Sequence, residues 1–223
     1  MADHGDTGTQ TPRERYRAQV QEEIKKHAWE QMAVAGASAL SLNAIAKQMG
    51  MSGPALYRYF AGRDELITEL IRDAYRSLAD TFRAASEAGG TGEPGLAALA
   101  HALRGWALAD PQRYFLIYGT PVPGYHAPDD ITAIASENMA VILDACAELP
   151  AADGPVTSFD SHIEGLGSRW ADGHAAPPVA LRRALAFWSR LHGVLSLELA
   201  GHFNGMGFDP ALLFAAELDD LLG

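Results

Sequence analysis

Hydrophobic positions recur at helical spacing along almost the whole chain. Between about residues 13 and 35, apolar side chains return every four residues, which places them on one face of an amphipathic helix. A longer helix with a single apolar stripe is expected over residues 63–88. The same spacing predicts further helices over residues 95–109, 111–119, 128–149, 178–203 and 210–222, and a short one near 159–170. No alternating apolar and polar run bounded by turn residues predicts a strand.

The composition favours the same fold class. Alanine and leucine account for 40 and 25 residues, whereas valine and isoleucine account for only 7 and 9. Alanine and leucine are strong helix formers, while the β-branched residues favour strands. We therefore expect an all-α protein. A polar lead over residues 1–12 is too poor in apolar side chains to fold, and we expect it to be disordered.

Two short helices are predicted between Ser41 and Phe60. Ser41 can cap the first helix, and Gly50 supplies the turn that follows it. Ser52 can cap the second helix, which runs through ALYRYF and ends at Ala61-Gly62. Two helices joined by a short glycine-containing turn form the helix-turn-helix motif.

The apolar residues of this motif divide it into a buried side and an outer side. Ile45 and Ala46 are expected to pack against Leu56 and Phe60. The residues left for the outer side are Ser52, Gly53, Pro54, Ala55, Tyr57, Arg58 and Tyr59. Hydroxyl groups, a guanidinium and the amides of a helix N-terminus satisfy phosphate oxygens and base edges. Small residues at its start would let the helix enter a major groove about 12 Å wide. The pattern alone leaves DNA binding and a merely structural helix pair equally open.

Charge is unevenly distributed along the chain. The net charge is −11, yet residues 13–63 hold eight basic and four acidic side chains. From residue 84 to the end there are 6 basic and 17 acidic side chains. This asymmetry favours an N-terminal module that faces nucleic acid and is carried by an acidic body. A single cysteine excludes a disulfide framework, and without a signal peptide or a membrane-length apolar run we expect a soluble, cytoplasmic protein.

One continuous run around the motif carries a family resemblance. The run IAKQMGMSGPALYRYFAGRDELI resembles the signature of the TetR family of bacterial transcriptional repressors, and the likeness extends over about residues 17–70. It implies phosphate contacts at Ser41, Tyr57 and Arg63 and groove-facing positions at Asn43, Gly53, Pro54, Ala55, Arg58 and Tyr59. The family usually has lysine where Arg63 stands and often a longer side chain where Gly53 stands. Direct base readout would then fall on Asn43, Arg58 and Tyr59.

The C-terminal half carries a second, weaker resemblance. FWSRLHGVLSLELAGHF (187–203) resembles the Trp-His-Gly helix of one TetR subgroup, and DPQRYFLIYGTPVPGYHAP fits the same group. The two resemblances imply a DNA-binding domain over residues 13–62 and a ligand-binding and dimerisation domain over 89–223. The helix over 63–88 would link them, and GGTGEPG (89–95) marks its end.

The predicted helix over 178–203 has two apolar stripes. One consists of Leu181, Leu185, Trp188, Leu195 and Leu199, and the other of Phe187, Leu191 and Val194. Two stripes indicate two neighbours. We expect one to be a symmetry mate, with 210–222 completing the four-helix bundle of a homodimer that reads a palindromic operator in double-stranded DNA. A central helix buried in a monomer is the alternative.

Aromatic residues are concentrated in the C-terminal part. The candidate ligand-binding residues are Trp106, Tyr114, Tyr118, Trp170, Trp188 and His192. Apolar pockets with a few polar groups bind small effectors, although aromatic side chains at helical spacing are more often core. We expect a small apolar or aromatic effector that favours a different tilt of the helix over 63–88 and so releases the operator. Glu198 and His202 are four residues apart, but two ligands do not make a metal site, and we expect neither metal nor cofactor.

Two other classes of protein compete with a regulator. A protein-binding adaptor could have kept the helical body and lost DNA contact; the acidic net charge favours it, whereas Ser41, Tyr57 and Arg63 argue against it. A small-molecule enzyme is less favoured, because the sequence has no G-x-G-x-x-G, P-loop, G-x-S-x-G, H-E-x-x-H or Cys-x-x-Cys motif. His162 and Glu164 lie close together but without a nucleophile or third ligand. We therefore predict a regulator without enzymatic activity.

Overall fold

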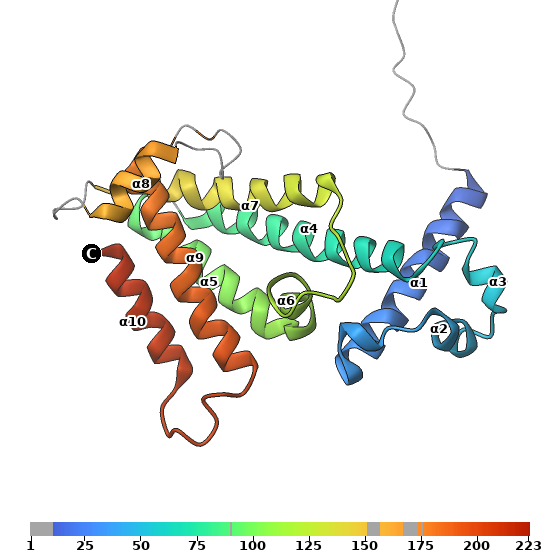
Figure 1. Ribbon diagram of the computed structural model, residues 1–223. Coiled ribbons are helices and arrows are strands. Elements are labelled where there is room, and N and C mark those ends of the chain that lie inside the picture. Colours follow the sequence, from blue (N-terminus) through green and yellow to red (C-terminus); the bar gives the residue numbers. More distant parts are fainter. Residues whose placement is uncertain (1–10, 90, 151–156, 167–173, 175) are drawn as a thin grey trace, which may run out of the picture. The chain divides into compact units, whose positions relative to one another are not determined.

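The computed structural model describes residues 11–89, 91–150, 157–166, 174 and 176–223, and all regular structure in these residues is helical (Figure 1). The elements are α1 (Pro12–Ala35), η1 (Ala37–Ala39), α2 (Leu42–Gln48), α3 (Gly53–Leu56), α4 (Arg63–Gly89), α5 (Glu93–Ala109), α6 (Pro111–Tyr118), α7 (Asp129–Ala147), α8 (Ser158–Leu166), α9 (Pro178–Leu199) and α10 (Pro210–Leu222). The predicted all-α class is confirmed. None of the described helices is long and apolar enough to span a bilayer.

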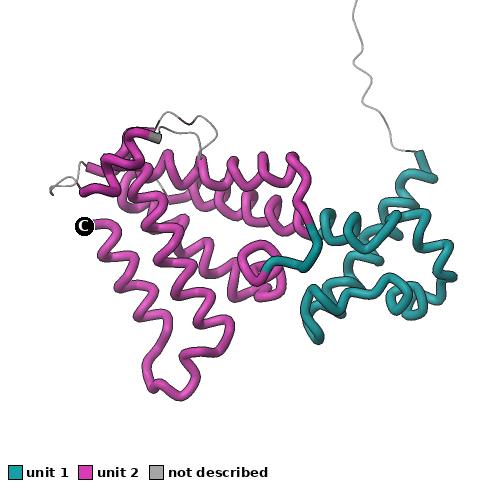
Figure 2. The backbone as a smooth tube through the Cα atoms, in the orientation of Figure 1, with its two compact units in different colours: residues 1–70, 121–125 teal, residues 71–120, 126–223 magenta. Residues whose placement is uncertain are grey.

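The chain forms two compact units, which Figure 2 distinguishes by colour. Unit 1 consists of residues 1–70 and 121–125, and unit 2 of residues 71–120 and 126–223. The helix α4 therefore contributes residues to both units. The sequence reasoning placed a domain boundary near residue 62 and did not assign residues 121–125 to the N-terminal part.

The first helix of unit 1 begins with a capping box. The Thr11 hydroxyl accepts a hydrogen bond from the Glu14 amide (3.3 Å), and the Glu14 carboxylate accepts one from the Thr11 amide (2.8 Å). Pro12 follows as the first helical residue, where its missing N–H costs nothing. The helix thus starts one residue before the predicted Arg13. Residues 1–10 of the predicted disordered lead lie outside the described residues. Its buried face is the predicted one: Val20, Ile24, Ala28 and Met32.

The second helix of the helix-turn-helix is shorter than predicted. Regular α-helix ends at Leu56, and residues 57–59 form a turn. The amides of Arg58 and Tyr59 donate to the carbonyls of Ala55 and Leu56, three residues back, instead of four (3.3 and 2.8 Å). This tighter winding is common at helix ends. The prediction of a continuous helix up to Ala61-Gly62 is wrong in this respect.

Unit 2 is built around α9, which contacts α5, α7, α8 and α10. Both predicted stripes of α9 face this core. Leu181 and Leu195 of the first stripe are buried, and so are all three residues of the second, Phe187, Leu191 and Val194. Leu185 and Leu199 of the first stripe are half-buried, and Trp188 exposes 39% of its surface. Neither whole stripe is therefore free for a partner subunit, and the expected assignment of one stripe to a symmetry mate is wrong.

Candidate DNA-binding surface and ligand cavity

The helix-turn-helix in unit 1 is held by the four residues expected to be buried. Ile45 and Ala46 of α2, Leu56 of α3 and Phe60 after it are all at most 2% exposed. Gly50 adopts a φ of 66°, a conformation that favours glycine, and the Met51 amide donates to the Ala46 carbonyl (2.8 Å). The turn and the two buried pairs fix α3 on α2.

The predicted contact residues on the outer side of the motif differ in how far they are exposed. Asn43, Ser52, Pro54, Tyr57 and Arg58 are exposed, and Tyr57 exposes 48% of its surface. Ser41, Gly53, Ala55, Tyr59 and Arg63 are half-buried. A Cβ at position 53 would lie 3.4 Å from the Asn43 carboxamide oxygen. The missing side chain of Gly53 therefore lets Asn43 lie directly against the start of α3.

Two of the half-buried residues are engaged within unit 1. The Ser41 hydroxyl caps α2 by accepting from the Ala44 amide (3.4 Å), and the Gln31 carboxamide accepts from the Ser41 amide (3.0 Å). The Tyr59 ring lies beneath the Arg17 guanidinium, 5.5 Å from the ring centroid. The structure thus assigns both residues an internal contact in addition to the predicted one with DNA.

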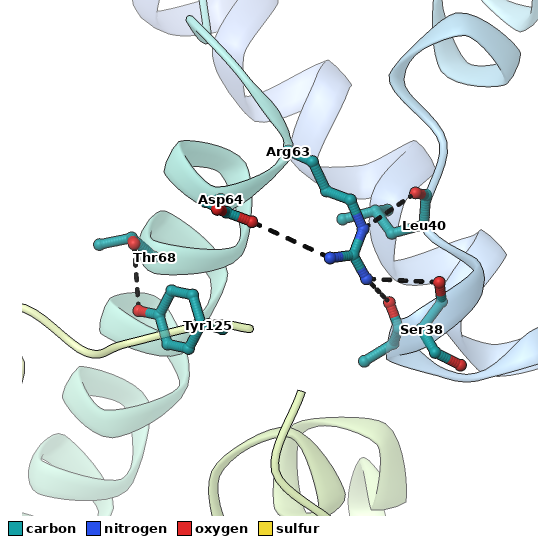
Figure 3. A network of polar contacts seen from close by, with 7 residues as sticks. Ser38, Leu40, Arg63, Asp64, Thr68 and Tyr125 are labelled. Atoms are coloured by element: carbon teal, nitrogen blue, oxygen red, sulfur yellow. Dashed lines mark hydrogen bonds and ion pairs between the residues drawn. The ribbon is translucent and has the colours of Figure 1, made fainter. Parts of the chain in front are cut away.

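Arg63, a predicted phosphate contact, is anchored to the loop before α2 (Figure 3). Its Nη2 donates to the Ala37 carbonyl (2.9 Å) and the Ser38 carbonyl (3.3 Å), and its Nε donates to the Leu40 carbonyl (3.3 Å). These carbonyls end η1 and precede the cap of α2. In this structure the guanidinium therefore acts as a brace for the start of α2.

The segment 121–125 is tied to the unit 1 part of α4. The hydroxyls of Tyr125 and Thr68 lie 3.0 Å apart (Figure 3). This contact joins a loop that follows α6 in sequence to a helix that begins beside the motif. Nothing in the local sequence pattern indicated it.

Unit 2 contains a cavity of about 530 Å³, here called the unit 2 cavity. Its walls come from α4, α6, α7, α8 and α9. The lining residues are Tyr75, Phe82, Tyr118, Thr132, Ala135, Ser136, Asn138, Met139, Ile142, Phe159, His162, Ile163, Leu185, Trp188 and His192. No Asp, Glu, Lys or Arg is among these described lining residues, so the walls suit an uncharged, mainly apolar molecule.

The structure separates the six predicted ligand residues. Tyr118, Trp188 and His192 line the unit 2 cavity, and the rings of Tyr118 and Trp188 flank the His192 ring at 4.2 and 6.0 Å. Trp106 and Tyr114 belong instead to the core; the Trp106 indole N–H donates to the Ser77 hydroxyl (3.1 Å). Trp170 lies outside the described residues. Aromatic spacing alone could not distinguish wall from core.

His192 is a lining residue whose pKa is shifted by burial. Burial lowers its pKa from 6.5 to about 4, so the imidazole is neutral at pH 7. The Tyr114 hydroxyl lies 3.0 Å from His192 Nδ1 and 2.8 Å from the Ser196 hydroxyl. Burial also raises the pKa of Tyr118. The polar groups of the wall are therefore hydrogen-bonding groups rather than charges.

Asn138 is a lining residue that the sequence reasoning missed. It is 4% exposed, its carboxamide N–H donates to the Tyr75 carbonyl (3.3 Å), and its oxygen has no partner among the described residues. A single asparagine on the apolar face of the predicted helix over 128–149 was the available signal, because buried polar residues are uncommon.

No metal centre is present in the part of the chain that the structure describes. No group of three or more His, Cys, Asp or Glu there is arranged to hold an ion. The carboxylate of Glu198, half of the pair weighed above with His202, accepts instead from Arg104 Nη2 (2.6 Å).

Two family models match the chain. Residues 24–70 match the model described as bacterial regulatory proteins of the tetR family, and residues 96–221 match the tetracyclin repressor-like C-terminal domain. The chain is 36% identical over 210 residues to the HTH-type transcriptional regulator Rv1816 of Mycobacterium tuberculosis (strain H37Rv), with 90% of each chain covered.

Solved structures agree with these matches. The crystal structure of SCO4313, described as a regulatory protein, is 72% identical and superposes with a TM-score of 0.85 over 96% of this chain and 100% of that one. The TetR family transcriptional regulator PfmR from Thermus thermophilus has a TM-score of 0.59 at 15% identity, over 89% and 96% of the two chains, and shares the fold.

Proposed function

Because this chain belongs to the TetR family of transcriptional regulators, we propose that it binds a palindromic operator as a homodimer and leaves it when an uncharged effector enters the unit 2 cavity. The family and the relatives named above are regulators, so the chain is a DNA-binding regulator with a helix-turn-helix and not an enzyme. What we propose beyond this assignment is the palindromic operator, the homodimer, the effector and action in the cytoplasm.

The observation that carries the DNA-binding part is the division of the motif into two sides. Leu56 and Phe60 are buried, while Tyr57 and Arg58 between them are exposed. The exposed hydroxyl and guanidinium can bond phosphate oxygens or base edges. Residues 13–63 also carry the excess of basic side chains, despite the acidic total.

The DNA-binding part is tested by measuring affinity against salt. The probes are duplexes that carry inverted repeats from the DNA upstream of the gene, with scrambled duplexes as controls. A DNA reader shows a steep fall of log affinity with log salt, because each neutralised phosphate releases counterions. Selection from randomised sites with Arg58→Ala should relax the preference at one position of each half-site, at a cost of roughly 1–3 kcal/mol. A protein-binding adaptor would show neither effect.

The proposed dimer uses the outer faces of α9 and α10, which lie side by side. The exposed residues that follow Trp188 on α9 and at its C-cap are small or apolar: Ser189, Gly193 and Leu197 on the helix, and Ala200 at the cap. On α10, Leu212 exposes 71% of its surface, and Leu197 on α9 exposes 44%. Small residues allow helices to approach closely, and the exposed leucines supply apolar area for a partner.

Gly193 gives a sharp test of the dimer. Apart from its sequence neighbours and the adjacent backbone of its own helix, a Cβ at Gly193 would meet no atom within 4 Å, and the same holds for Gly105 on α5, which is also exposed. Gly193→Leu should therefore leave the subunit folded but weaken dimerisation at least about tenfold in sedimentation, since an added side chain blocks close helix approach. Gly105→Leu is the matched control. Equal dimerisation of both variants would contradict this interface.

The effector part follows from the shape of α4. One helix runs from Arg63, which braces the motif, through Tyr75 and Phe82 on the cavity wall. A ligand that prefers a different position of Tyr75 and Phe82 can act on unit 1 through this helix. The ligand weakens DNA binding only to the extent that it binds the DNA-free state more tightly than the DNA-bound state. A compound that fills the cavity without changing operator affinity would contradict release.

A further inference from the structure

Only one of the two imidazole nitrogens of His192 makes a hydrogen bond to the described residues. Its Nδ1 lies 3.0 Å from the Tyr114 hydroxyl, and the Tyr114 ring stacks on it with centroids 5.5 Å apart and an interplanar angle of 25°. Its Nε2 has no hydrogen-bond partner among the described residues and is not an enclosed atom. His192 lines the unit 2 cavity and its Nδ1 is occupied by the core residue Tyr114, so Nε2 is the nitrogen left to meet a ligand there.

The hydrogen-bond partners of Tyr114 bear on which nitrogen of His192 carries the proton. The Tyr114 oxygen lies 2.8 Å from the Ser196 hydroxyl, 3.0 Å from His192 Nδ1 and 3.2 Å from the His192 carbonyl oxygen. A phenol donates more readily than it accepts, because its lone pair is delocalised into the ring. The Tyr114 hydroxyl has a single proton, which can go to the His192 carbonyl oxygen (3.2 Å) or to Nδ1 (3.0 Å). Nδ1 is the nearer of these two acceptors, so we assign the Tyr114 proton to Nδ1 and have the Ser196 hydroxyl donate to the Tyr114 oxygen. In a neutral imidazole the proton then sits on Nε2.

We propose that Tyr114 and Ser196 hold His192 as an Nε2–H donor, and that the unit 2 cavity takes an uncharged aromatic ligand carrying an acceptor oxygen such as a ketone, ester or quinone carbonyl. His192 contacts the ligand, and Tyr114 is a positioning residue that acts through it. The inference rests on the proposed function, since it takes the unit 2 cavity as the effector site. Burial, which lowers the pKa of His192 to about 4, agrees with a neutral donor.

Other features of the cavity agree with this class of ligand. Its described walls lack charged Asp, Glu, Lys and Arg side chains that could pair with an ionic ligand. The rings of Tyr118 and Trp188 flank the imidazole, so an aromatic ligand that reaches Nε2 would lie between aromatic side chains.

Two probes of nearly equal shape test the donor directly. In 2-acetylnaphthalene a carbonyl oxygen stands where 2-isopropylnaphthalene has a methyl group. We expect the wild-type protein to bind the ketone about tenfold more tightly, in line with one buried hydrogen bond to a neutral donor. Binding of both probes is read by isothermal titration calorimetry. Equal affinities would overturn the inference and leave the cavity as an apolar site, whereas no binding of either probe would remove the proposed effector site itself.

Variants separate the positioning residue from a merely structural one. His192→Phe should abolish the difference between the probes, and Tyr114→Phe should reduce it to about twofold while the affinity for the hydrocarbon stays within about twofold, because only the donor loses its orientation. Tyr118→Phe is the matched control: it removes another tyrosine hydroxyl from α6 at the same cavity, and this hydroxyl does not contact Nδ1. If Tyr118→Phe narrows the difference instead, Tyr118 reads the carbonyl and the inference fails.

The tautomer can be read without any variant. Long-range proton–nitrogen correlation spectra of the wild-type protein should show His192 protonated at Nε2 and not at Nδ1 at pH 7. In Tyr114→Phe the spectrum should move toward a mixture of the two tautomers. Protonation at Nδ1 in the wild-type protein would overturn the inference even if Tyr114→Phe does not fold.

Discussion

Unit 1 and unit 2 present their functional groups in opposite ways. In unit 1 the exposed side chains come from one short stretch of chain and point outward from a locally braced motif. In unit 2 the lining residues come from five helices that are far apart in sequence and surround a cavity. The polar groups differ as well: Arg63 and Ser41 have partners within unit 1, whereas the buried carboxamide oxygen of Asn138 has no partner in the described part of the chain.

This difference indicates what each unit requires of its ligand. An outward surface with satisfied internal contacts needs only a complementary surface, and a charged polymer provides one. A cavity with an unpartnered buried group is completed by a molecule of matching size that supplies the missing hydrogen bond. The predictions below test the two halves of this contrast, beginning with the largest expected effect.

Removing the Phe60 side chain should produce the largest difference in stability between the two units. Phe60 is 1% exposed, and Phe60→Ala should lower the free energy of unfolding of unit 1 by about 3–5 kcal/mol because it leaves a cavity. Urea denaturation followed at Trp29 for unit 1 and at Trp106 for unit 2 measures the effect on each. The exposed Val34→Ala is the control. If both units of Phe60→Ala unfolded at the same urea concentration, the difference between the two units would not extend to their stability.

Acid should destabilise unit 2 through His192. Its pKa is about 4 in the folded protein against 6.5 for the free group, so the unfolded chain binds more protons between these values. The free energy of unfolding should therefore fall as the pH falls from about 6.5 toward 4, by at most about 3 kcal/mol from this group. His192→Phe should reduce this slope relative to the wild-type protein. His162 lines the same cavity, and His162→Phe is tested in the same way. The prediction would be contradicted if only His162→Phe changed the slope of the free energy of unfolding against pH.

Arg63→Lys distinguishes a brace from a phosphate contact. Lysine keeps the charge but cannot reproduce the three hydrogen bonds to the carbonyls of residues 37, 38 and 40. We expect a loss of about 1–2 kcal/mol in the stability of unit 1, measured by urea denaturation. The number of released counterions, read from the salt dependence of DNA binding, should stay the same. Unchanged stability together with weaker binding would return Arg63 to the phosphate contact that the family resemblance implies.

The smallest effect is expected at the exposed surface of unit 1. Tyr57→Phe removes one hydroxyl and should weaken binding to all duplexes alike by about 0.5–1.5 kcal/mol, without changing stability. Tyr16→Phe, on the exposed part of α1, is the matched control. A change in base preference with Tyr57→Phe would mean that Tyr57 reads a base edge rather than a phosphate.

The same contrast explains what could be predicted from the sequence. The all-α class, most helix positions and the four buried residues of the motif follow from spacing and capping, which act over a few residues. Ile45, Ala46, Leu56 and Phe60 lie within one motif, so their burial could be inferred directly. The early end of α3 could not, because Leu56 and Phe60 stand four residues apart, a spacing that a continuous helix would give as well.

The cavity could be predicted only in part. Tyr118, Trp188 and His192 were named from aromatic content, yet Trp106 and Tyr114 have the same spacing and lie in the core. The side of a helix that faces a cavity depends on which neighbours pack against it, and no local pattern encodes that. Asn138 and the anchoring of Arg63 depend equally on contacts between distant parts of the chain.

The interrupted course of unit 1 has a consequence for exchanging parts between relatives. Residues 121–125 belong to unit 1 although 50 residues of unit 2 precede them, and the Tyr125 hydroxyl contacts Thr68. A chimera with a single crossover at residue 70 would join the helix-turn-helix of one parent to the Tyr125 segment of another. Grafting DNA specificity onto a new sensor therefore requires three crossovers, after residues 70, 120 and 125, so that the short second segment is exchanged together with the first.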